Sequence, residues 1–156
     1  MALADLLTPD EDVQETKNIL TRTLHTLAEA AGEYARASLG AANTVLEIAM
    51  EGGPCAEAYT PYTEITKYDR LARRAVDNLT DITNLLLAVN RSEDDYANRA
   101  YADHLSEMTK INETSALLEA SANRLGVINR ALPKNPQPAA RFDASIFSAK
   151  EGAQEG

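Results

Sequence analysis

The chain has no tryptophan, a single cysteine and only two histidines among its 156 residues. Cys55 alone cannot form an internal disulfide, and a chain of this length can build a core without one. Two histidines without an E-x-x-H pair do not provide the ligands of a di-iron helical bundle, so we expect no metal and no cofactor. Paired carboxylates, a catalytic triad and a phosphate-binding loop are also missing from the visible motifs. We therefore expect a protein that is not an enzyme.

The sequence also has few positive charges and no long apolar run. Its formal net charge is -9 at pH 7, and because contacts to phosphates need clustered Lys and Arg, this charge argues against a nucleic-acid partner. No run approaches the about 20 apolar residues that span a bilayer, so no membrane insertion is expected. Residues 1–12 lack the basic region of a signal peptide. With one cysteine, these features predict a cytoplasmic protein or part of an assembled particle.

Helix-forming residues dominate what is present. Aromatic residues make up only 5% of the chain, and the sparse supply of strand-forming types favours an all-helical protein. The clearest pattern lies in residues 61–90, where apolar residues at steps of three and four line one helical face. They are Ile65, Tyr68, Ala72, Ala75, Leu79, Ile82, Leu86 and Val89. Thr60 followed by Pro61 predicts the start of this helix, because a hydroxyl cap and a proline suit the first turn.

Two further helices are predicted on either side. A seven-residue repeat runs to about Met50 through Val13, Leu20, Leu27, Tyr34, Ala41 and Ile48, interleaved with Leu24, Ala31, Ser38 and Val45. Gly52-Gly53-Pro54 predicts its end. The third seam contains Ala97, Tyr101, His104, Met108, Ile111, Ser115, Leu118, Ala122 and Leu125. Short connections make neighbouring helices antiparallel. The sequence predicts an all-α, elongated, antiparallel three-helix bundle (up-down-up) over residues 1–132, with helices at about 9–51, 61–90 and 93–131.

Residues 133–156 are predicted to form an extended or partly disordered C-terminal arm. Three prolines within six residues oppose helix and favour an extended path. The arm nevertheless holds the only two phenylalanines of the chain, Phe142 and Phe147, with Ile146 between them. Large apolar side chains grouped in this way usually mark a contact. Either the arm folds back onto its own bundle, over residues such as Leu85 and Leu87 in the apolar end of the second helix, or it docks on a neighbouring subunit.

Two other groups of residues are candidate sites. Tyr34, Tyr68, Tyr101 and His104 fall on predicted seams, where they could line a polar pocket for a small ligand; tyrosines in a bundle core fit equally well. The stretch that begins at His25 faintly resembles the start of a histidine phosphotransfer domain, a helical bundle with an exposed histidine in an H-x-x-K-G-like run. Ala28 and Glu29 stand where that run has lysine and glycine, so we interpret His25 as a surface histidine.

The function that these features favour is a non-enzymatic structural, assembly or adaptor protein. It would associate with itself or dock a protein partner through the bundle surface and the arm, with Phe142, Ile146, Phe147, Leu85 and Leu87 as the contact residues. The alternative is a helical bundle that senses a small ligand or a signal. No catalytic residue and no metal ligand is predicted.

Overall fold

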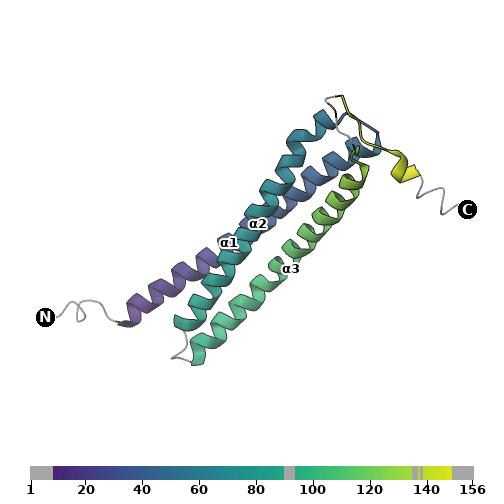
Figure 1. The fold of residues 1–156 in the computed structure, drawn as a ribbon. Coiled ribbons are helices and arrows are strands. Elements are labelled where there is room, and N and C mark those ends of the chain that lie inside the picture. The colour runs from purple at the N-terminus through teal and green to yellow at the C-terminus, as the bar shows by residue number, and fades with distance from the viewer. Residues whose placement is uncertain (1–8, 90–93, 135–136, 138, 149–156) are drawn as a thin grey trace, which may run out of the picture. The chain divides into compact units, whose positions relative to one another are not determined.

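The structure, a computed structural model, describes residues 9–89, 94–134, 137 and 139–148; within these ranges the side chains of residues 9–13, 87, 89 and 94–106 are not described. Three helices follow one another along the chain (Figure 1): α1 (Pro9–Met50), α2 (Cys55–Val89) and α3 (Asp94–Ala131). The described residues contain no strand, and α1 packs against both other helices. The prediction of an all-α three-helix bundle is therefore confirmed.

The chain divides into two compact units, and each unit takes a segment of every helix. Unit 1 contains residues 1–33 and 71–114, and unit 2 contains residues 34–70 and 115–156. In unit 1, Leu24 and Ala28 of α1 pack with Leu79 of α2, and Ile111 of α3 lies against them. Early α1 thus meets late α2 and early α3, which is the contact pattern of the predicted up-down-up order.

Unit 2 has the larger core, built where α1 ends, α2 begins and α3 ends. Its buried residues are Ala41, Ala42, Val45, Ala49, Ala58, Ile65, Ile128, Ala131 and Phe142. Most of these side chains are small, and small side chains let helix axes approach closely. Phe142 is the one aromatic side chain among them, and it comes from beyond α3.

The predicted seam of α1 is buried at Leu24, Ala31, Ser38, Ala41 and Val45, but not at its other described positions. Leu20, Leu27, Tyr34 and Ile48 are only half-buried. Four alanines outside that seam are buried beside it, with exposed fractions of 3% or less: Ala28, Ala35, Ala42 and Ala49. In this helix the small residues occupy the closest contacts, and the large ones pack at the edges of the stripe.

The predicted α3 seam is correct at Leu118, which is buried, and wrong at two of its small residues. Ser115 and Ala122 are exposed, whereas Glu107, Thr114 and Ser121 are buried at seven-residue spacing. The hydroxyl oxygens of Ser121 and Ser38 lie 2.8 Å apart, and Ser38 donates its proton to the carbonyl oxygen of Ile65 at 3.1 Å. Ser121 must then be the donor to Ser38, and this chain of bonds satisfies both buried hydroxyls.

Helix α2 begins six residues before the predicted start. The helix runs from Cys55, so Pro61 lies inside it, and Thr60 is not the cap. Proline has no N–H to donate, so Pro61 leaves one helical carbonyl without its usual partner. The earlier start is held by tertiary contacts, because the Cys55 amide donates to Ala140 at 2.9 Å and Ala58 is buried in the core.

The predicted end of α1 is confirmed, since the helix ends at Met50. Gly52 has a φ of 65°, a left-handed conformation that glycine adopts without strain. The Gly53 amide donates to Ile48 at 2.8 Å and the Gly52 amide to Ala49 at 3.1 Å. These two bonds form a Schellman motif, which satisfies carbonyls at the helix end.

Neighbouring leucines in α2 offer a matched test of this packing. Leu86 is 2% exposed and Leu85 is 53% exposed. We expect Leu86→Ala to lower the free energy of unfolding by about 2–5 kcal/mol because it opens a cavity. The same change at Leu85 should cost less than about 0.5 kcal/mol. Urea unfolding followed by circular dichroism measures both, and equal losses for the two variants would contradict the placement of this seam.

Candidate functional site

The C-terminal residues 140–148, which we name the docking segment, pack onto unit 2 of the same chain. Phe142 is 5% exposed and belongs to the unit 2 core with Ala49, Ala58 and Ala131, while Ile146 and Phe147 lie partly buried against that core. We name the receiving surface the docking site; it is formed by the last turn of α1, the α1–α2 turn, the start of α2 and the end of α3. One short segment therefore contacts the ends of three helices.

Main-chain hydrogen bonds fix the docking segment in place. The Cys55 amide donates to the Ala140 carbonyl at 2.9 Å, and the Phe142 amide donates to the Gly53 carbonyl at 3.0 Å. These bonds flank an isolated antiparallel bridge between Pro54 and Arg141. The pairing is a single antiparallel bridge, in which the main-chain bonds hold the segment and the buried Phe142 side chain packs beside them.

Two further bonds extend from the docking segment to helix ends. Arg141 donates from Nε to the Gly52 carbonyl at 2.9 Å, and the Asp143 amide donates to the Ala131 carbonyl at 2.8 Å. Gly52 follows α1, and Ala131 is the last residue of α3. Carbonyls at helix ends have no partner within the helix, so the docking segment supplies what these ends need.

Asp143 organises the second half of the docking segment. Its Oδ1 accepts hydrogen bonds from the Ser145 amide at 3.0 Å and the Ser145 hydroxyl at 2.5 Å, at the start of a helical turn over residues 145–148. The Ser145 hydroxyl, and then its amide, lower the pKa of Asp143 below its ordinary value of 3.8. This turn places Ile146 and Phe147 against unit 2.

The predicted contact residues are thus partly brought together. Phe142, Ile146 and Phe147 share the docking site. Leu85 belongs to unit 1 and is 53% exposed, and the side chain of Leu87 lies outside the described residues. Sequence reasoning missed the α1–α2 turn as the receiving surface. The Gly52-Gly53 pair was the available signal, because main chain can approach closely where a side chain is absent.

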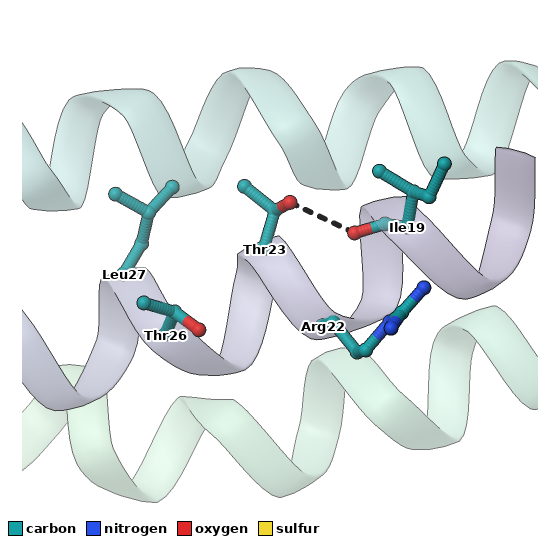
Figure 2. Close-up of a pocket in the computed structure, with 5 residues that line it drawn as sticks. All are labelled: Ile19, Arg22, Thr23, Thr26 and Leu27. Atoms are coloured by element: carbon teal, nitrogen blue, oxygen red, sulfur yellow. Dashed lines mark hydrogen bonds between the residues drawn. The ribbon is translucent and has the colours of Figure 1, made fainter.

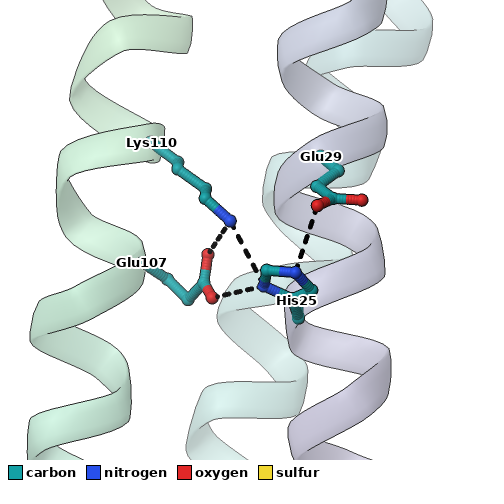
Figure 3. Close-up of polar contacts among 4 residues, drawn as sticks. All are labelled: His25, Glu29, Glu107 and Lys110. Carbon is teal, nitrogen blue, oxygen red and sulfur yellow. Dashed lines mark hydrogen bonds and ion pairs between the residues drawn. The ribbon is translucent and has the colours of Figure 1, made fainter.

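A second polar cluster joins α1 and α3 within unit 1 (Figure 3). His25 Nδ1 lies 3.0 Å from Oε1 of Glu107, and His25 Nε2 lies 3.1 Å from Oε1 of Glu29. Lys110 Nζ is 3.2 Å from the same Nδ1 and 3.6 Å from Oε2 of Glu107. A doubly protonated imidazole would donate to both carboxylates, whereas a neutral one with its proton on Nε2 would accept at Nδ1 from Lys110.

Glu107 is the buried residue of this cluster, and its burial is energetically unfavourable. Its side chain is only 10% exposed, and Oε2 is buried without a hydrogen-bond partner. A buried carboxylate is destabilising unless charged partners compensate for lost hydration. Lys110 Nζ, 3.6 Å from Oε2, provides a compensating charge, and the His25 ring contacts Oε1 at 3.0 Å. The cluster therefore ties α3 to α1 at one register.

A shallow groove of about 370 Å³ also lies along α1 in unit 1 (Figure 2). It is lined by Ile19, Arg22, Thr23, Thr26 and Leu27. The Thr23 hydroxyl donates to the Ile19 carbonyl at 2.8 Å, which turns it toward its own helix. The lining is mainly apolar, and Ile19 is 49% exposed.

The residues proposed for ligand sensing are only partly described. The rings of Tyr34 and Tyr68 stack with their centroids 6.4 Å apart, so these two side chains pack on one another. The side chains of Tyr101 and His104 lie outside the described residues. Within the described part of the chain, no group of three or more His, Cys, Asp or Glu residues is placed to hold a metal ion. In that same part, no helix has both the length and the apolar character needed to cross a membrane.

The Asp143 turn predicts a pH response in the docking segment. The bonds from Ser145 lower the pKa of Asp143, so the stability that these bonds contribute is present above the unfolded pKa and is lost as pH falls through the folded pKa. We expect the Ser145 amide signal in NMR spectra to shift only below the ordinary Asp143 pKa of 3.8, as protonation of Asp143 weakens this bond. Ser145→Ala should raise the pKa of Asp143, while Ser148→Ala, the matched control, should not. An unchanged pKa in Ser145→Ala would refute the role of this bond.

The His25 cluster predicts energetic coupling between α1 and α3. A double-mutant cycle with His25→Ala and Glu107→Gln should give an interaction energy of about 0.5–3 kcal/mol, because the two side chains are in direct contact. Urea unfolding measures each corner of the cycle. Arg22→Ala with Glu107→Gln serves as the control pair and should be additive. Additivity of His25 and Glu107 would show that their contact contributes nothing.

Comparison of the chain with known protein families, with curated proteins and with solved structures found no significant match. Its function is therefore inferred from its own residues, chiefly those of the docking site and the His25 cluster. The docking site offers main-chain and aromatic recognition of a peptide segment, and the His25 cluster places the buried Glu107 of α3 against partly exposed side chains.

Proposed function

We propose that the chain is a non-enzymatic helical assembly or adaptor protein, which acts by binding protein through its bundle surface and its docking segment. The observation that supports this proposal most is the chemistry of the docking segment. It combines a buried aromatic anchor, Phe142, with main-chain bonds to Gly53, Cys55 and Ala131. Aromatic anchors in desolvated pockets carry much of the binding energy at protein interfaces.

Exposed apolar side chains on the helices support the same proposal. Met50, Tyr59 and Leu132 are 53%, 70% and 38% exposed in unit 2, and Ile19 and Leu85 are about half exposed in unit 1. Leu85 was among the contact residues that the sequence predicted. Large apolar residues on a helical surface are candidate contacts for another protein. Because a single Cys55 fits a reducing compartment, we place the protein in the cytoplasm or in an assembled particle.

The arrangement of titratable groups favours a binding role over catalysis. His25, Glu29, Glu107 and Lys110 bond to one another between α1 and α3 (Figure 3). A catalytic group must instead lie within hydrogen-bond reach of a substrate in a pocket. The charges of this cluster are thus engaged in holding two helices together.

Light scattering coupled to size-exclusion chromatography tests the proposal across a concentration series. We expect the full chain to form oligomers, and a variant that ends at Leu132 to form smaller ones while circular dichroism still reports helix. Phe142→Ala with Phe147→Ala should weaken association, since removal of a buried aromatic side chain costs about 3–5 kcal/mol. The exposed Lys134→Ala is the matched control and should leave association unchanged. A monomer for the full chain at every concentration would overturn self-association as its role.

A further inference from the structure

We infer that the groove along α1 in unit 1 binds a basic amphipathic helix of another protein. The groove is lined by Ile19, Arg22, Thr23, Thr26 and Leu27 (Figure 2). This inference rests on the proposed function and deepens it, because it assigns one face of the bundle to a partner of stated chemistry. The docking site in unit 2 is a separate surface, which the chain's own residues 140–148 occupy.

The shape of the groove suits a helix. Ile19, Thr23 and Leu27 form one row at four-residue steps, and a second row beside it contains Arg22 and Thr26 (Figure 2). Rows of side chains four residues apart are the ridges through which helices pack, and the groove between two such rows receives a ridge of a second helix. From Ile19 to Leu27 the first row extends about 12 Å along the axis, which is slightly more than two helical turns. A partner helix can therefore lie along the groove with an apolar ridge between the two rows.

The groove is a poor enclosure for a small molecule. All five lining residues belong to α1, so the groove lies on the surface of a single helix. Sites for small ligands instead bury most of the ligand's surface inside a concave pocket. A helix laid on α1 covers the groove without a second wall. Ile19, which is 49% exposed, then loses contact with water, and this burial of apolar area favours binding.

The polar groups in the lining already have partners in their own helix. The Thr23 hydroxyl donates to the Ile19 carbonyl at 2.8 Å, and Arg22 Nε donates to the Asn18 carbonyl at 3.4 Å. Covering a polar group is unfavourable when it loses hydrogen bonds to water and gains none in return. Because these two donors keep their bonds within α1, an apolar ridge can cover them without supplying new acceptors.

The charge of unit 1 selects a basic partner. Unit 1 contains 15 acidic and 7 basic residues, a net charge of -8, whereas unit 2 contains 9 acidic and 8 basic residues, a net charge of -1. Nearly all of the chain's net charge of -9 therefore belongs to the unit that carries the groove. A positively charged helix is attracted to such a surface. A second copy of the chain would bring its own acidic unit and be repelled.

Acidic side chains also flank the groove within α1. Glu15 lies one turn before Ile19 in the same row, Glu33 lies two turns after Thr26, and both are exposed. Lys or Arg residues beside the apolar ridge of a partner helix can pair with these carboxylates near the two ends of the groove. Charges at the rim of an interface raise the rate of association and help to select the partner. The matching helix is thus apolar along one ridge and basic on its flanks.

Fluorescence anisotropy with a labelled synthetic peptide tests this inference on the full chain. The probe is a peptide of leucine and lysine with its leucines on one helical face, and about 18 residues give it enough length to form helix. One control peptide has glutamate in place of lysine. The other has the same composition with leucines spread around the helix. We expect the probe to bind at least about tenfold more tightly than either control.

A matched pair of variants locates the bound peptide. Ile19→Gln should weaken binding by about tenfold, because an apolar anchor is lost from the groove. Met50→Gln is the control and should leave the affinity unchanged, since Met50 is similarly exposed, at 53%, but belongs to unit 2. Circular dichroism of both variants checks that the helices are retained.

A second pair of variants tests the charges. Glu15→Gln combined with Glu33→Gln should weaken binding and reduce its dependence on salt, because salt screens exposed charges. Glu47→Gln combined with Glu57→Gln removes two exposed carboxylates from unit 2 and is the control. This control should bind the peptide as the unmodified chain does.

Absence of binding up to about 1 mM chain would overturn the inference, and so would equal affinity for either control peptide. Equal affinity of the Ile19→Gln and Met50→Gln chains would do the same. Light scattering separates these results from the proposed function. A chain that forms oligomers but does not bind the probe overturns the basic helix as partner and leaves self-association standing. Oligomers that Ile19→Gln dissociates would also overturn it, since a second copy would then occupy the groove. A monomer that binds the probe through Ile19 overturns self-association and supports the inference.

Discussion

The need to satisfy open helix ends governs the best-defined part of this structure. Where α1 ends, α2 begins and α3 ends, main-chain groups face a common space without partners in their own helices. The docking segment supplies those partners to Gly53, Cys55 and Ala131, and it inserts Phe142 among them. The early start of α2 depends on this contact. So does the burial of the only aromatic residue in the unit 2 core.

Polar contacts between α1 and α3 appear in both units. In unit 1, His25 and Lys110 contact the buried Glu107. In unit 2, Ser121 donates a hydrogen bond to Ser38, which donates to the Ile65 carbonyl. Buried polar groups contribute little net stability, but they penalise any register that separates them. The alanine stripe of α1 tolerates sliding more than large interlocking side chains would. The polar contacts fix the register of α1 against α3, which small side chains do not fix by themselves.

Prediction from the sequence succeeded where a residue acts through its own backbone or through a strong period. Gly52 ends α1 because the left-handed conformation suits glycine, and Leu79 and Leu86 are buried as their spacing indicated. Prediction failed where a contact from a distant part of the chain determines a helix start or the burial of a residue. Pro61 predicted a helix start that the Cys55–Ala140 bond moved upstream. Ser121 was missed because the predicted α3 seam ran through Ser115 and Ala122, which are exposed.

The sequence by itself determined three helices, their antiparallel order and the importance of the phenylalanine-bearing tail, because apolar period, capping residues and connection length are local properties. Tertiary structure alone decided which further small and polar residues of α1 and α3 are buried, among them Ala42, Glu107 and Ser121, since alanine, serine and glutamate enter a core only when a partner fits them. It also decided where Phe142 docks. That choice depends on carbonyls and amides left open by three separate helix ends, and a linear sequence does not show which ends will meet.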